Sequence, residues 1–155
     1  MYLMLKLIHI LSATILFGTG LGTAFFKWRA DQSGDVASIA HTNRVVVLAD
    51  WVFTTPAIVI QPLSGMFLMQ KLGMTDFPPW LIIALCLYGL AGLCWLPVVA
   101  LQLRMRRVSA QAWATAKPLP AQYWRDARYW FYLGIPAFTA MIAIYGLMMF
   151  KPTWV

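Results

Sequence analysis

The chain has 155 residues, of which 61% are hydrophobic and 11% are charged, and its mean hydropathy is +0.70. Soluble domains are near half apolar and a quarter charged, so this composition excludes a soluble enzyme, a disordered chain and a secreted disulfide scaffold. The length allows one domain, or about four membrane-spanning helices of roughly 20 residues each. Continuous rather than alternating apolar runs argue against a membrane β-barrel. We therefore expect an all-α integral membrane four-helix bundle with up-down topology, in which residues 1–155 form a single membrane domain.

Four apolar segments define the expected spans. In chain order they cover residues 2–26, 45–69, 79–103 and 129–150. The first is not expected to be a cleavable signal peptide, because it lacks a basic start and ends in Phe25-Phe26-Lys27 rather than at small residues. A short interfacial helix over residues 108–116 is expected in the third connection, where Lys117-Pro118 would end it.

The basic residues predict the orientation of the bundle. Lys and Arg number 12 against five acidic residues, giving a net charge of +7. Nine of the twelve fall in the first and third connections, and three lie on the opposite side. Cytoplasmic connections carry the excess of Lys and Arg, so both termini are expected on the periplasmic side of a bacterial inner membrane. No basic face exists outside these two connections, so the expected partner is the lipid bilayer and not nucleic acid.

Three ionisable residues fall within the spans, where such groups are costly and often functional. Lys6 lies close enough to the start of its helix for its charge to reach the interface. Asp50 has a short side chain and lies one to two turns into the second span. We expect a structural ion pair between Asp50 and Arg44, with Lys27 and Arg104 as alternative partners and a proton relay as the alternative role.

His9 lies about 10 Å inside the first span. Imidazole is the commonest protein ligand of haem and transition metals, and the alternative is an ordinary hydrogen-bonded packing residue. The other histidine, His41, lies about 25 Å away along the helix axis. Both histidines therefore cannot bind one iron in the same subunit.

The up-down topology predicts which side chains share the depth of His9. They are polar, aromatic or sulfur-bearing: Met66, Cys86, Tyr88, Tyr145 and Met148, with Gln61 one or two turns deeper. From this layer we expect a haem site formed by His9, Met66, Tyr145 and Met148, with His9 on the iron. A methionine is the preferred sixth ligand, and a vacant position or Lys6 are the alternatives. Methionines that only fill gaps in packing would give the same pattern.

Small residues indicate where helices can pack closely. Gly18 and Gly22 form a Gly-xxx-Gly pair in the first span. Such a pair permits close approach of helices, either within the chain or in a homodimer.

Three segments resemble the HemJ family of bacterial membrane protoporphyrinogen oxidases. These segments are YLMLKLIHI (residues 2–10), TTPAIVIQPLSGMFLM (54–69) and IPAFTAMIAIYGLMMFKP (135–152), which are similar to that family's first, second and fourth spans. A closer resemblance is to an uncharacterised family of four-helix bacterial membrane proteins beside HemJ and the membrane domain of the copper-resistance protein CopD. The HemJ resemblance implies a b-type haem bound by a histidine of the first span, which corresponds to His9.

The sequence departs from HemJ at two places. HemJ-type proteins carry a lysine early in span three, soon after a Trp, whereas residues 81–84 after Trp80 are apolar here. They also have an Asn-Glu pair before the span-four proline, where this chain has Leu133-Gly134. If those polar residues handle the substrate, this protein binds haem without oxidising protoporphyrinogen.

Two functions remain open at this point, and with them the question of whether the protein is an enzyme. The first is a HemJ-like haem b-binding membrane protein, a possible oxidoreductase in porphyrin- or quinone-linked electron transfer with a membrane redox partner. The second is a non-catalytic accessory or assembly subunit, or a small transporter component, without a cofactor. Copper ranks third, because the methionines form no Met-x-x-Met cluster on a solvent-facing connection.

Overall fold

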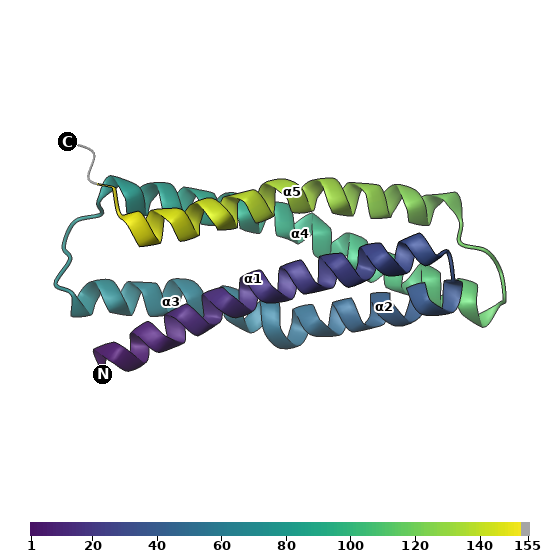
Figure 1. The fold of residues 1–155 in the computed structure, drawn as a ribbon, viewed down its shortest axis with the longest axis horizontal. Coiled ribbons are helices and arrows are strands. Elements are labelled where there is room, and N and C mark those ends of the chain that lie inside the picture. The colour runs from purple at the N-terminus through teal and green to yellow at the C-terminus, as the bar shows by residue number, and fades with distance from the viewer. Residues whose placement is uncertain (153–155) are drawn as a thin grey trace.

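The computed structural model describes residues 1–152, which fold almost entirely into long helices (Figure 1). In chain order these are α1 (Tyr2–Ser33), α2 (Val36–Ala49), the π-helical segment η1 (Asp50–Thr54), α3 (Thr55–Lys71), α4 (Pro79–Ala114) and α5 (Ala121–Phe150). The segments α2, η1 and α3 follow one another without a break, so the chain has four helices long and apolar enough to cross a membrane. No strand occurs among residues 1–152. The predicted all-α bundle with four spans is confirmed.

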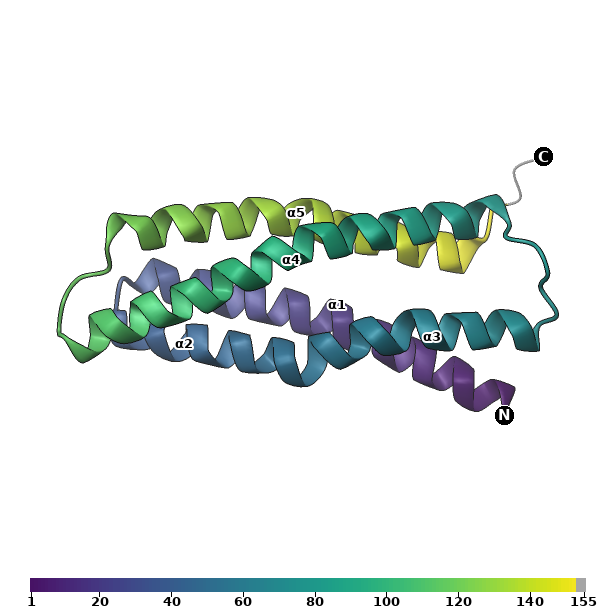
Figure 2. The ribbon, with the colours of Figure 1, turned by 180° about the vertical axis from the view of Figure 1, so that it is seen from behind.

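The helices run alternately in opposite directions. The start of α1, the end of α5 and the connection formed by residues 72–78 lie at one end of the bundle, and the other two connections lie at the opposite end (Figures 1 and 2). This is the expected up-down arrangement. Helices of 30 to 36 residues are about 45–54 Å long, so they extend well beyond a hydrocarbon core of about 30 Å.

The first connection is a two-residue turn, and not the long loop that the sequence predicts for residues 27–44. Gly34 adopts a left-handed conformation (φ 67°) that ends α1, and its N–H bonds to the carbonyl of Asp31. Asp35 then caps α2, because its carboxylate accepts from the N–H groups of Ala37 (3.4 Å) and Ser38 (2.9 Å). Glycine after a helix and aspartate before one are the residues that stop and start helices at low cost.

The third connection is also shorter than predicted. Helix α4 continues to Ala114 and α5 begins at Ala121, so the expected separate helix over residues 108–116 is the end of α4. No proline or glycine interrupts residues 98–114, and an apolar span can continue as a polar helix outside the membrane. Pro118 and Pro120 fall between the two helices, where no helical N–H is required.

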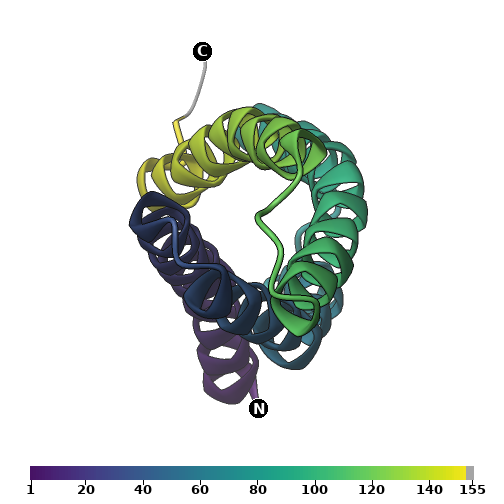
Figure 3. The same cartoon turned by 90° about the vertical axis from the view of Figure 1, so that its right-hand side faces the viewer.

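The helices pack unevenly along the bundle. At the end with the two short connections, the side chains of Ala30, Ile39, Val98, Met105, Tyr123 and Trp130 form a buried core. Figure 3 looks along the bundle from this end and shows the four helices arranged around its centre. Toward the chain termini α3 packs on α1, but within the described residues none of its Cα atoms comes within 8 Å of one on α4 or α5. The backbone of α3 is therefore further from α4 and α5 at this end.

Candidate functional site

His9 joins α1 to α3 through both nitrogens of its ring. Its Nδ1 lies 2.9 Å from the hydroxyl of Ser64, and its Nε2 lies 3.2 Å from the amide nitrogen of Gln61. Ser12, one turn after His9, bonds through its hydroxyl to the side-chain oxygen of Gln61. His9, Ser12, Gln61 and Ser64 form a closed polar group, which we call the His9 cluster.

The pattern of donors assigns the state of the imidazole. Ser64 donates its hydroxyl proton to the carbonyl of Ile60 at 2.7 Å, so its oxygen accepts from His9 Nδ1–H. Nε2 then carries the lone pair and accepts from the amide of Gln61. His9 is therefore a neutral imidazole whose Nδ1–H is held by a hydroxyl. Iron-ligating and zinc-ligating histidines use this form, with the second nitrogen fixed by a hydrogen bond.

Gly65 gives the imidazole room to approach α3. A Cβ atom at this position would lie 3.2 Å from Cε1 of His9, which is tighter than ordinary carbon contacts. By contrast, a Cβ at Gly18 or Gly22 would meet nothing within 4 Å. The expected close packing of these two glycines within the chain is therefore not seen. The glycine required for close packing follows Ser64 directly, in the segment PLSG.

The other expected haem residues do not gather around His9. Tyr145 packs edge-on against Phe17, with ring centroids 5.6 Å apart. The two rings line a cavity of about 340 Å³ between α1 and α5, whose other lining residues are Thr14, Gly18 and Ile142. Met66 is half exposed on α3, and neither Met66 nor Met148 makes a polar contact with His9 among the described residues. The structure thus brings Gln61, which was expected one or two turns deeper, into contact with His9 and adds Ser12 and Ser64.

The ion pair expected between Asp50 and Arg44 is not formed. Asp50 accepts a hydrogen bond from the hydroxyl of Thr54 at 2.8 Å, and Arg44 contacts Nδ1 of His41 at 3.3 Å. Six residues turn a helix through about 600°, so Arg44 and Asp50 point to different sides. The expectation failed because it considered depth in the membrane and not the direction of each side chain around the helix.

The two alternative partners of Asp50 also bond elsewhere. Arg104 lies 3.5 Å from Asp126, and Lys27 lies 2.8 Å from Asp31. Lys27 was expected in a connection, yet it is only 1% exposed. Its pairing was visible in the sequence as opposite charges four residues apart, a spacing that brings helical side chains together.

Lys27 belongs to a second buried polar group, which we call the Tyr123 network. The hydroxyl of Tyr123 accepts from Lys27 Nζ (3.0 Å) and from the amide of Asn43 (3.0 Å), and it donates to Asp31 (2.6 Å). Asn43 also donates to Ser109 at 3.0 Å. These residues come from α1, α2, α4 and α5: the phenol oxygen joins α5 to α1 and α2, and Asn43 extends the network to α4. The sequence prediction missed the network because it placed Lys27 and Tyr123 in loops.

A side chain of α4 replaces the backbone hydrogen bond that Pro62 removes from α3. Proline has no N–H, so the carbonyl four residues earlier, at Ile58, has no helical donor. The hydroxyl of Tyr88 on α4 donates to this carbonyl at 2.7 Å. Tyr88, for which the sequence predicted only a depth, therefore has a structural role.

The comparison with protein families matches residues 3–152 to a family described as "Predicted integral membrane protein (DUF2269)". The chain belongs to this family. No curated protein matches the chain, and no solved structure matches it. As a DUF2269 protein it is an integral membrane protein, and the four long apolar helices are its candidate spans.

The polar groups lie at different positions along the bundle. Asp50 lies 14 residues from the start of the helix Val36–Lys71, or about 21 Å, and is therefore in the middle third of that helix. The His9 cluster lies toward the end with the chain termini, and the Tyr123 network lies toward the opposite end. A charged residue at the centre of a span costs about 2.5–3.5 kcal/mol on insertion scales, so Asp50 is the most costly of these groups.

Proposed function

We propose that this DUF2269 protein binds haem b within the membrane, with His9 as an iron ligand, and that it takes part in porphyrin- or quinone-linked electron transfer. The observation that supports this is the neutral imidazole of His9, whose Nδ1–H is held by Ser64 at 2.9 Å and whose Nε2 has the lone pair. The similarity of residues 2–10 to the first span of HemJ supports the same assignment.

His9 can serve as a haem ligand if its Nε2 exchanges its hydrogen bond with Gln61 for a bond to iron. The amide of Gln61, now 3.2 Å from Nε2, must turn away before that nitrogen can bind iron. The 340 Å³ cavity between α1 and α5 lies about two turns further along α1. Met66, Met148 and Tyr145 are the further contacts that the sequence predicts. When bound, haem supplies one-electron chemistry, and the chain binds it, orients the imidazole through Ser64 and keeps water away.

Two absences from the sequence favour electron transfer over oxidation of protoporphyrinogen. Residues 81–84 are apolar where HemJ has its span-three lysine, and the chain contains no glutamate. We therefore propose a redox carrier that works with a membrane partner. We also propose a bacterial inner membrane location with periplasmic termini, because α1 begins and α5 ends at one end of the bundle and nine of the twelve basic residues lie within residues 27–44 and 104–128, which include the two connections at the other end.

An accessory or assembly subunit without a cofactor is the second candidate. The observation that favours it is that both ring nitrogens of His9 already have partners in the chain alone. An absorption spectrum of detergent-purified protein separates the two functions. The haem proposal predicts a Soret band that is lost in His9→Ala and kept in His41→Ala, and a parent protein without the band contradicts it.

Two conservative variants test how His9 is held. Gln61→Leu frees Nε2, so we expect it to retain haem at least as well as the parent. Ser64→Ala removes the partner of Nδ1–H, and loss of such a partner weakens metal binding by about 10–100-fold. Equal haem affinity in the parent and Ser64→Ala would contradict the proposed orientation of the ring.

The proposed orientation has its own test. A periplasm-active reporter fused after Val155 should be active, and a cytoplasm-only reporter at the same position should not be. Strong activity of the cytoplasmic reporter contradicts the orientation but leaves the haem proposal standing.

A further inference from the structure

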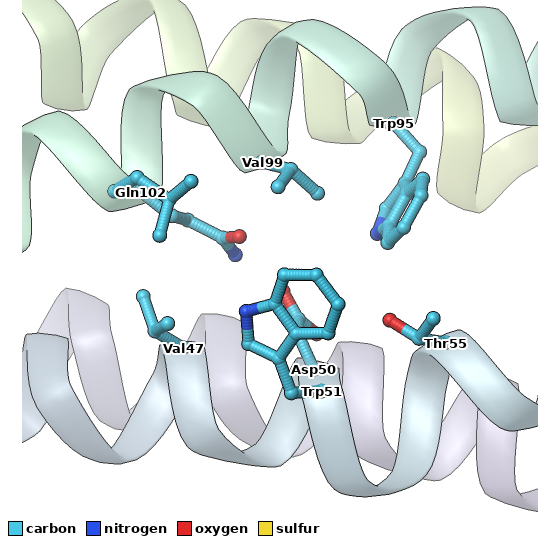
Figure 4. Close-up of a pocket in the computed structure, with 8 residues that line it drawn as sticks. Val47, Asp50, Trp51, Thr55, Trp95, Val99 and Gln102 are labelled. Carbon is cyan, nitrogen blue, oxygen red and sulfur yellow. The ribbon is translucent and has the colours of Figure 1, made fainter.

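Asp50 begins the only π-helical segment within the described residues, η1 (Asp50–Thr54). Here the N–H of Thr55 bonds to the carbonyl of Asp50, five residues earlier. Such wide turns are rare in helices and often occur at functional sites. Asp50 is 8% exposed, and apart from its bond with Thr54 its carboxyl group points away from its own helix (Figure 4).

No charged side chain compensates Asp50. The salt bridges among residues 1–152 join Lys27 to Asp31 and Arg104 to Asp126, and none includes Asp50. On α1, which packs against η1, residues 10–26 contain no ionisable group. On α4, the titratable residues between positions 80 and 103 are Cys86, Tyr88 and Cys94. The carboxyl group of Asp50 thus has no cationic partner within residues 1–152.

A cavity of about 60 Å³ lies between η1 and α4 beside this carboxyl group. Gln102, which is 5% exposed, directs its amide toward Asp50 across the cavity, and the hydroxyl of Thr55 lies on the far side (Figure 4). The indole rings of Trp51 and Trp95 flank the space. Aliphatic side chains complete its walls. Two polar side chains, each more than nine-tenths buried, therefore face one small and otherwise apolar space.

The residues that line the cavity determine which kind of ligand it can bind. A carboxylate with amide and hydroxyl oxygens accepts hydrogen bonds from N–H groups, and indole faces attract cations. The apolar remainder suits methyl groups but offers too few oxygens to replace the hydration shell of a metal ion. At about 30 Å³ per water molecule, the space admits a guest of about two heavy atoms.

We infer that the cavity between η1 and α4 binds a small organic ammonium ion of the size of methylammonium, with Asp50 as its counter-ion. The guest's positive charge compensates the carboxylate, and its N–H groups bond to Asp50, Gln102 and Thr55. Its methyl group packs against Trp51 and Trp95. The site is distinct from the His9 cluster and does not depend on the haem proposal.

Binding of radiolabelled methylammonium to detergent-purified protein tests the inference. We expect saturable binding of about one ion per chain, competed by unlabelled methylammonium. Tetramethylammonium, with five heavy atoms, should not compete at equal concentration, and neither should sodium. No saturable binding to the parent overturns the inference, and competition by sodium overturns its assignment to an organic ion.

Matched variants connect binding to the site. Asp50→Asn keeps the shape and the bond to Thr54 and should weaken binding by roughly 30-fold or more, the scale for removing one partner of a buried charge pair. Asp76→Asn, outside the spans, should bind as the parent does. Trp95→Leu leaves Asp50 intact and should also weaken binding, so the inference does not depend on the folding of one variant. Parent-like binding by Asp50→Asn overturns it.

Discussion

The hydroxyl of Tyr123 is the shared atom of the network that joins the four long helices, and Tyr123→Phe removes it alone. The change deletes the bonds to Lys27 (3.0 Å), Asn43 (3.0 Å) and Asp31 (2.6 Å). Two of these bonds involve charged groups, each worth about 1.5–3 kcal/mol. They share one oxygen and are not additive, and Lys27 keeps its bond with Asp31. We therefore expect a loss of about 3 kcal/mol in the free energy of unfolding.

Thermal unfolding in detergent measures this loss. For a chain of this length, 1 kcal/mol shifts Tm by about 2–4 °C, so Tyr123→Phe should melt about 6–12 °C below the parent. Tyr132→Phe is the matched control, because Tyr132 lies on the same helix and is 61% exposed. If Tyr123→Phe melts with the parent and the control, the network does not hold the helices together.

Three further changes follow from single contacts. Tyr88→Phe leaves the Ile58 carbonyl unpaired beside Pro62, and should cost about 1–3 kcal/mol; an unchanged Tm contradicts this repair. Asp35→Ala removes the cap of α2 and should cost about 1 kcal/mol, seen as a smaller Tm shift that parent-like melting would refute. Gly65→Ala places a Cβ 3.2 Å from Cε1 of His9, and should alter the NMR shifts of that ring; an unaltered imidazole spectrum contradicts the contact.

Hydropathy located the four spans because burial in lipid requires long apolar runs, and α1 and α4 contain the predicted segments. It could not locate their ends. Residues after Lys27 are polar and basic, a composition that fits a loop or a helix outside the membrane equally well. Gly34 and Asp35 decide between these, since a left-handed C-cap followed by an N-cap predicts a tight turn. The sequence thus contained the signal for the turn. The prediction instead followed the change from apolar to polar residues, and so ended the helix too early.

Partners between helices were harder to predict than depth. Topology placed Gln61 within one or two turns of the depth of His9, since depth depends only on residue count along each span, but it did not predict the contact between them. Asp50 bonds to Thr54 and not to Arg44 because of the direction in which each side chain points around the helix. The helix changes pitch at η1, which alters these directions. The Tyr123 network required knowing that two predicted loops are helical. In each case the missing information was the direction in which a side chain points around its helix axis. An up-down topology gives the order and direction of the helices but not their rotation about their own axes.

The haem content of purified protein, measured as pyridine haemochrome per chain, tests the proposed function most directly. The parent and His41→Ala should each hold about one haem per chain, and His9→Ala should hold almost none, because His9 is the one histidine among the predicted spans. Either a parent without haem, after expression with a full haem supply, or a His9→Ala protein with parent-like haem content would contradict the proposal.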